Sequence, residues 1–212
     1  MAATSRTRSL DSVAEDMQPQ LGLRERKKLK TRVAIRRATY RLIAEQGYDA
    51  TTVEQIAEAA EVSPSTVFRY FPTKEDIVLT DEYDPVMVAE LRARPADEAP
   101  LDSLRHVVVK ATRLALETDR EEMIQRTGLL VRVPALRSRL MQSIALTSRL
   151  LNGVLAERTG RAEDDLEVRA FSMAALGTIY EATVYWAERD HRDDLVELVQ
   201  RSLNTIGNGL RG

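Results

Sequence analysis

The amino-acid sequence predicts an all-α protein with a small N-terminal three-helix domain and a larger helical C-terminal domain. Along most of the chain, apolar residues recur at spacings of three and four, which is the period of an α-helix. No segment alternates apolar and polar residues convincingly, so a β-sheet is not expected. Helix-starting residues such as Ser63 and Thr73 stand directly before periodic segments.

The amino-acid composition excludes several classes of protein and of functional site. The chain has 212 residues, of which 43% are hydrophobic and 30% are charged, as in soluble globular proteins. It contains no cysteine, which excludes disulfides, zinc–thiolate sites and cysteine nucleophiles. It has neither an apolar run of the roughly 18 residues that span a membrane nor a signal-peptide-like start. We therefore expect a cytoplasmic protein without a membrane segment.

Two short helices with a tight turn between them are predicted in residues 51–76. Thr52 starts the first helix, and Gln55 follows it at the capping-box spacing. Ser63 starts the second helix, and Pro64 occupies its first position, where a missing N–H costs nothing. This arrangement is the helix-turn-helix unit, whose second helix enters the major groove of DNA.

The second helix has the side chains of a DNA-recognition helix. Val67 and Phe71 are expected to face the core, which leaves hydroxyls, aromatic rings and a cation on the other faces. Hydroxyls bond base edges or phosphates, and an aromatic ring packs on a thymine methyl. An ordinary helical hairpin with an exposed polar face is the alternative. The residues left for contacts are Ser65, Thr66, Phe68, Arg69 and Tyr70.

The charge distribution indicates that only the N-terminal part meets phosphate. The net charge is −2, but residues 1–74 hold 13 Lys/Arg and 9 Asp/Glu, whereas residues 75–212 hold 18 and 24. Residues 24–37 contain eight Lys/Arg against one glutamate. We interpret this run as a phosphate-contacting patch, with a solvated helix face as the alternative. The helix that begins in it is expected to end at Gly47.

The chain divides into three parts. Residues 1–23 are polar and aperiodic, and we expect a disordered basic arm that is either a flexible tail or a minor-groove contact. Residues 24–80 form the helix-turn-helix domain. Residues 81–212 form a helical ligand-binding and dimerisation domain, joined to the first by a helix over residues 73–92 that Pro85 is expected to kink. Five further helices are predicted, over residues 104–115, 123–131, 136–155, 162–190 and 193–206.

The last two helices are predicted to form the interface of a homodimer. A single short recognition helix reads too few base pairs, whereas a two-fold dimer sets two of them roughly 34 Å apart, one turn of DNA. The alternative is that both helices complete the monomer core. The residues assigned to the interface are Ala170, Ala174, Gly177, Thr178 and Glu181, with Leu195, Val199, Leu203 and Ile206 on the last helix.

No enzymatic site stands out in the sequence. His191 lies in a charged turn and is expected to be solvated, whereas His106 could face a cavity. No Ser/His/Asp arrangement, phosphate-binding glycine loop or metal-ligand cluster is evident. We therefore expect no catalytic residue, no metal and no cofactor.

Read as a set, four segments resemble the DNA-binding domain of the TetR family, namely residues 36–48, 50–57, 62–71 and 74–76. The resemblance covers roughly residues 30–80. It implies an all-helical, dimeric, ligand-responsive transcriptional regulator.

The same resemblance implies roles for single residues. Ser65 and Thr66 match positions that approach bases, whereas Phe68 departs from the family, which often has a phosphate-contacting tyrosine there. The positions that match phosphate-contacting sites are Thr52, Tyr70 and Lys74. The full set of expected DNA contacts is Lys30, Thr52, Ser63, Ser65, Thr66, Phe68, Arg69, Tyr70 and Lys74.

Residues 66–78 and the helices after them are similar to TetR-family regulators with an acyl-CoA-like ligand-binding domain. This similarity implies a repressor that leaves a palindromic double-stranded DNA operator when a small hydrophobic or amphipathic effector binds. Arg126 and Arg132 are expected to meet a phosphate or carboxylate at the mouth of an apolar channel. The expected ligand residues are His106, Met123, Arg126, Leu130, Arg132, Leu140, Ile144, Phe171 and Met173. The alternatives are a solid core with surface arginines, a helical dimeric interaction protein, and a regulator without a small-molecule ligand.

Overall fold

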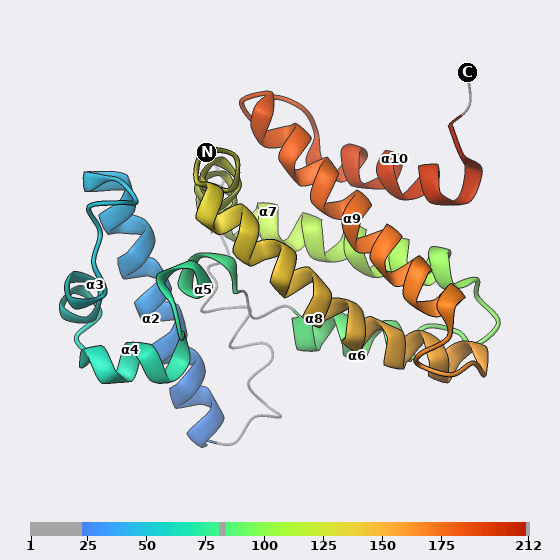
Figure 1. Ribbon diagram of the computed structural model, residues 1–212, viewed down its shortest axis with the longest axis horizontal. Coiled ribbons are helices and arrows are strands. Elements are labelled where there is room, and N and C mark those ends of the chain that lie inside the picture. The colour runs from blue at the N-terminus through green and yellow to red at the C-terminus, as the bar shows by residue number, and fades with distance from the viewer. Residues whose placement is uncertain (1–22, 81–83, 211–212) are drawn as a thin grey trace, which may run out of the picture. The chain divides into compact units, whose positions relative to one another are not determined.

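The computed structural model describes residues 23–80 and 84–210, and within these ranges every regular element is a helix (Figure 1). The expected all-α fold class is confirmed. The predicted arm lies outside the described residues except for Leu23. The helices are α2 (Leu23–Gln46), α3 (Val53–Ala59), α4 (Pro64–Tyr70), α5 (Lys74–Leu79), α6 (Asp84–Ala93), α7 (Pro100–Arg132), α8 (Pro134–Thr159), α9 (Leu166–Glu188) and α10 (Leu195–Asn208).

The chain forms two compact units. The first contains the described residues up to Thr80 together with Glu117–Arg126 from the middle of α7, and the second contains the rest. The backbone of α7 leaves the helical region at Asp119, with φ −141° and ψ 46°. The two separate helices predicted over residues 104–115 and 123–131 are therefore one helix with a break.

Side-chain caps start the helices of the first unit where the sequence predicted them. The Thr52 hydroxyl accepts a hydrogen bond from the backbone N–H of Gln55, whose side chain accepts one from the Thr52 N–H in return. Ser63 caps α4 by accepting from the N–H of Thr66. The turn between α3 and α4 places Glu61 at a φ of 55°. These caps satisfy backbone donors that a helix start leaves unpaired.

The core of the first unit fixes the orientation of α4. Val67 and Phe71 are 0% and 1% exposed and pack with residues of α2, α3 and α5. Burying side chains of this kind contributes about 1.5–3 kcal/mol each. The inner face of α4 is therefore held by packing, and its outer face is left to solvent. The cluster consists of Ile35, Ile56, Ala57, Val67, Phe71 and Ile77.

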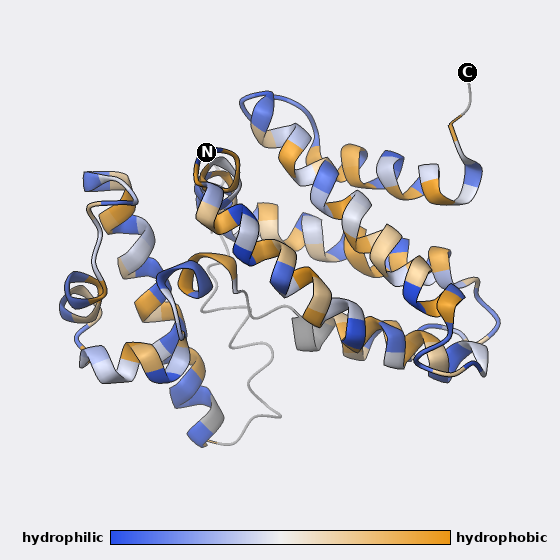
Figure 2. Cartoon of the chain, in the orientation of Figure 1, coloured by the Kyte–Doolittle hydropathy of each residue, from blue (hydrophilic) through white to orange (hydrophobic). Residues whose placement is uncertain are grey.

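In the second unit, α9 packs against both α8 and α10 (Figure 1). Trp186 near the end of α9 is buried and donates from Nε1 to the carbonyl of Asp193 at 2.8 Å, which holds the loop before α10. Gly160 ends α8 with a φ of 68°, a left-handed conformation that glycine adopts without strain. Figure 2 shows hydrophobic and hydrophilic residues interspersed along these helices, as amphipathic helices require.

The helix predicted over residues 73–92 is wrong, because it consists of two helices. Thr80 ends α5 in an extended conformation, and α6 begins at Asp84. Pro85 is the second residue of α6, in the first turn, where a helix tolerates proline. Pro85 therefore belongs to a helix start and does not kink a longer helix.

The interface role predicted for the apolar stripe of α10 is also wrong. Leu195, Val199 and Leu203 are buried within the protomer itself, and Ile206 is half-buried. Because α10 packs on α9, its apolar side completes the core of the second unit. The alternative interpretation, in which these residues belong to the monomer core, is correct for α10.

Candidate nucleic-acid interface

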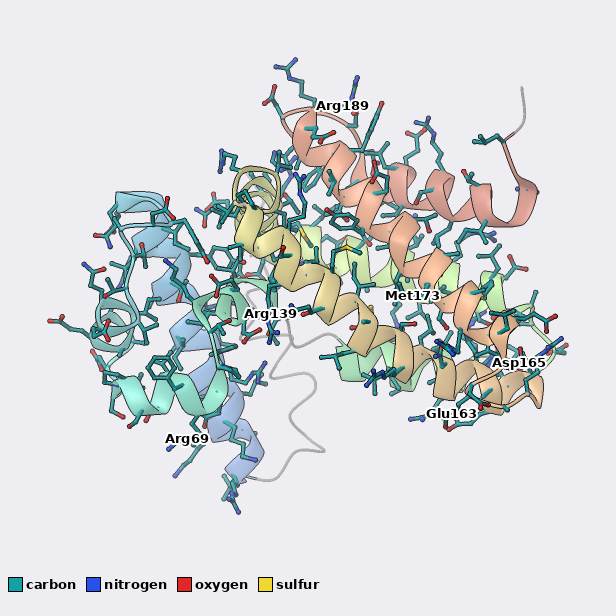
Figure 3. The ribbon with its side chains drawn as sticks, in the orientation of Figure 1. Arg69, Arg139, Glu163, Asp165, Met173 and Arg189 are labelled. Atoms are coloured by element: carbon teal, nitrogen blue, oxygen red, sulfur yellow. The ribbon has the colours of Figure 1, made fainter. Side chains whose placement is uncertain are left out.

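The outer face of α4 presents hydroxyls, a ring and a guanidinium to solvent. The Ser63 hydroxyl lies 2.9 Å from the hydroxyls of both Ser65 and Thr66, so three hydroxyls gather at the start of the helix. Phe68 is 50% exposed, although phenylalanine is among the residues that are most often buried. Arg69 is exposed and extends away from the ribbon in Figure 3. Hydroxyls and a guanidinium are the groups that read base edges and phosphates.

Tyr70 and Thr52 are two further hydroxyl-bearing residues that were predicted to contact DNA. Tyr70 is half-buried against the core cluster, and the guanidinium carbon of Arg69 lies 5.4 Å from its ring centroid. The Thr52 hydroxyl accepts the capping hydrogen bond and keeps its own proton for an outside acceptor. A cap of this kind leaves the hydroxyl at the helix N-terminus, where an anion is favoured.

Lys74 is bound into the fold, which the sequence pattern did not predict. Its Nζ donates to the carbonyls of Tyr48 at 2.8 Å and Thr51 at 3.0 Å, and it lies 4.0 Å from the centroid of the Tyr48 ring. Lys74 therefore closes the loop between α2 and α3. An ammonium group has three donors, so one remains for an outside acceptor.

Tyr48 of this loop also pairs with Glu75 of α5. The Tyr48 hydroxyl donates to Glu75 Oε1 at 2.6 Å. Burial, together with this hydrogen bond and the negative charge of Glu75, raises the pKa of Tyr48 above its ordinary range. Burial has the largest single effect and would raise the pKa of Glu75. The hydrogen bonds from Tyr48, the Glu75 backbone and Thr73, together with the charge of Lys74, outweigh burial, so the pKa of Glu75 lies below its ordinary value. Glu75 is therefore ionised near neutral pH.

The basic run of α2 is not uniform. Lys30 is exposed and available to a phosphate, as the interpretation of this run requires. Arg36 is only 2% exposed, and its Nε lies 2.7 Å from Glu122 Oε1 on α7, within the first unit. Arg32 lies with its guanidinium carbon 4.9 Å from the centroid of the Phe71 ring. Part of the positive charge of α2 thus serves the fold.

The nine expected ligand residues differ in exposure and in the unit to which they belong. Leu130 and Ile144 are buried, and Leu140 and Phe171 are half-buried, all in the second unit. Three others are exposed in the protomer, and their predicted contacts with a ligand stay predictions. These are His106, Arg132 and Met173. Met123 and Arg126 belong to the segment of α7 that groups with the first unit, and Arg126 Nη2 donates to the Met123 sulfur at 3.5 Å.

His191 is not simply solvated, as was expected. Its Nε2 lies 2.8 Å from the hydroxyl of Thr127, and its ring meets Trp186 edge to face at a centroid distance of 4.4 Å. Thr127 is buried on α7, 64 residues away in the chain. No local pattern around His191 indicates this interaction, since the partner lies on another helix.

Comparison with known proteins identifies the class. The family described as "Bacterial regulatory proteins, tetR family" matches residues 35–80, and the family described as "MftR C-terminal domain" matches residues 98–211, more than half of the chain. The chain therefore belongs to the tetR family of bacterial regulatory proteins, and it is a DNA-binding transcriptional regulator.

Particular relatives match different lengths of the chain. The HTH-type transcriptional regulator TcmR of Streptomyces glaucescens is 48% identical over 85 residues, which is 39% of this chain and 38% of that protein. The fatty acid metabolism regulator protein of Bacillus subtilis is 25% identical over 181 residues, 82% of this chain and 92% of that one. The crystal structure of FadR from Bacillus subtilis in complex with stearoyl-CoA has 27% identity and a TM-score of 0.56, covering 84% of this chain and 99% of that one.

None of the helices within residues 23–80 and 84–210 has the combination of length and hydropathy that crossing a lipid bilayer demands.

Proposed function

We propose that this regulator binds a palindromic operator as a homodimer and is released from it by a small amphipathic effector of acyl-CoA type. The single observation that supports DNA recognition most strongly is the division of α4 into a fully buried face and an exposed polar face. Packing holds the helix rigidly from behind, so its outer side chains can be presented in a fixed geometry to the major groove.

In this proposal the side chains of the interface make three kinds of DNA contact: to base edges, to a thymine methyl and to phosphates. Ser65 and Thr66 approach base edges from the start of α4, while Arg69 reaches further from its exposed side. Phe68 packs on a thymine methyl. The phosphate contacts are assigned to Lys30, Thr52, Tyr70 and the remaining N–H of Lys74, with Ser63 as the cap that orders the hydroxyls.

The outer face of α9 supports the homodimer. Small and apolar residues recur there at helical spacing and are exposed in the protomer, namely Leu166, Ala170, Met173, Ala174, Gly177 and Tyr185. A Cβ added at Gly177 would have no atom within 4 Å, so the helix surface there is open. On α8, Leu146 and Leu150 are 58% and 56% exposed. Exposed apolar residues that recur along a helix are a feature of protein–protein contacts.

Two observations support an effector of acyl-CoA type: the similarity of the chain to FadR, and the uncharged interior of the second unit. FadR of Bacillus subtilis, described in complex with stearoyl-CoA, is similar over 84% of this chain. The buried residues described in the second unit are all uncharged. Such an interior suits the apolar chain of an effector and not its charged head group.

The proposal is tested by DNA binding with the full chain. Operator fragments selected from the native genome are bound by the dimer in fluorescence anisotropy at several salt concentrations, and affinity is expected to fall steeply with salt. Release is then titrated with long-chain acyl-CoA, free fatty acid and a cationic hydrophobic drug. Release by the drug alone would exclude the acyl-CoA effector, and a salt-independent affinity would exclude the proposed phosphate contacts.

A further inference from the structure

Two polar side chains that lie buried on α8 and α9 of the second unit each have an oxygen without a hydrogen-bond partner. Ser172 on α9 is 0% exposed and Asn152 on α8 is 8% exposed, and neither the serine hydroxyl nor the amide oxygen is paired. The two helices pack against each other. A buried polar atom left unpaired costs about 1–3 kcal/mol, so each of these positions would be more stable with an apolar side chain.

The buried residues next to these two along their helices are mostly apolar, although Ser148, one turn before Asn152, is also buried. Ser172 stands between Val168 and Ala175 on the buried side of α9, and Asn152 stands between Leu151 and Leu155 on the buried side of α8. The usual internal solution for a helical hydroxyl is a hydrogen bond to a carbonyl one turn back. Thr159 on α8 makes that bond to Leu155 O at 2.7 Å, whereas Ser172 does not.

We propose that these two side chains bind a hydroxyl group carried on the apolar body of the effector. A hydroxyl both donates and accepts, so it can donate to Asn152 Oδ1 or accept from the Ser172 hydroxyl. A half-turn of the Asn152 amide puts its N–H₂ in the place of Oδ1. In that case the effector hydroxyl accepts a hydrogen bond from the N–H₂. A saturated acyl chain has no atom that can pair with either. The inference rests on the proposed effector binding in the second unit and adds that the effector is a hydroxylated apolar molecule.

The test compares three thioesters on the full-length dimer, namely lauroyl-CoA, 3-hydroxylauroyl-CoA and 12-hydroxylauroyl-CoA. At least one hydroxylated thioester is expected to bind about tenfold more tightly than lauroyl-CoA in isothermal titration calorimetry, because its hydroxyl fills an unpaired hydrogen-bonding position. In Ser172→Ala and Asn152→Leu the ratio of the affinities for the hydroxylated thioester and for lauroyl-CoA is expected to fall to about twofold or less. Equal binding of all three thioesters to the wild type overturns the inference.

Ser103 supplies a matched control, since it is also a serine of 0% exposure in the second unit. Its hydroxyl donates to Glu98 Oε2 at 2.6 Å and accepts from Arg158 Nη2 at 3.0 Å. Ser103→Ala should lower the melting temperature, whereas Ser172→Ala should leave it unchanged or raise it. A drop in Ser172→Ala as large as that in Ser103→Ala would show an internal partner and overturn the inference.

Failure of the effector class and failure of the hydroxyl site give different results. If no thioester binds, the acyl-CoA effector proposed above is wrong, and the comparison is repeated with 1-dodecanol and its methyl ether, which lacks the donor. Preference for the alcohol that disappears in Ser172→Ala supports the hydroxyl site. Equal binding, or binding of neither compound, overturns it.

Discussion

Replacing Lys74 by methionine tests whether this residue builds the DNA-binding unit as well as contacting DNA. The ammonium donates to the carbonyls of Tyr48 and Thr51 and lies over the Tyr48 ring. Methionine keeps the apolar stem but removes every donor. The Tyr48 carbonyl retains a hydrogen bond from the N–H of Thr51 at 3.3 Å, so the main loss falls on the Thr51 carbonyl.

The size of the effect follows from these interactions. Hydrogen bonds to a charged group contribute about 1.5–3 kcal/mol when buried, and Lys74 is only half-buried, so solvent reduces the contribution of the pair. We expect the free energy of unfolding to fall by about 2 kcal/mol. In a chain of this length that corresponds to a drop of roughly 4–8 °C in melting temperature, measured by differential scanning calorimetry.

Lys30→Met is the matched control, since Lys30 is an exposed lysine of the same unit. It should leave the melting temperature unchanged and reduce the slope of log affinity against log salt by about 0.9, the value for one phosphate that is no longer neutralised. Lys74→Met should weaken binding to all DNA sequences similarly. A melting temperature of Lys74→Met within about 1 °C of the wild type would refute the structural role of the lysine.

Three further predictions concern assembly, the core and pH. Gly177→Arg should turn the dimer into monomers in sedimentation, because it buries an unpartnered charge at the proposed interface. Ala89→Arg on α6 is the control and should leave the dimer intact. A dimer of undiminished affinity in Gly177→Arg would place the interface elsewhere. Phe71→Ala should destabilise the first unit by about 3–5 kcal/mol and abolish operator binding, yet leave dimerisation intact. Because the folded-state pKa of Glu75 is depressed, its ion contributes stability above the unfolded-state pKa that is lost as pH falls through the folded-state pKa. Glu75→Gln should therefore lose less stability than the wild type in acid urea titrations, and identical acid limbs would contradict this.

Features that depend on short-range chemistry were predictable from the sequence. A threonine or serine placed before an apolar stripe starts a helix by accepting a backbone N–H three residues on, as Thr52, Ser63 and Thr73 do. Helical periodicity then fixed which residues of α4 face inward, and Val67 and Phe71 are buried as expected. The outer face of α4 follows as the remainder, so the residues proposed to contact DNA could be named without a structure.

The periodicity of apolar residues in a sequence predicts that one side of a helix is apolar. It does not predict which element covers that side. The stripe of α10 and the exposed small residues of α9 look alike in sequence, yet only the first is covered within the protomer. The same limit applies to Met173, which was predicted to line an apolar channel and is 43% exposed in the protomer.

The sequence by itself determined the helices, their ends and the faces of the recognition helix, because those depend on interactions within one or two turns of the chain. Only the tertiary structure decided the partners of charged and polar groups. Lys74 bonds to carbonyls 23 and 26 residues away, and His191 meets Thr127 across 64 residues. Arg36 is withdrawn from the basic surface by Glu122 on α7. Such pairs form between residues that the fold brings together, and a polar side chain has no periodicity that would reveal its partner in advance.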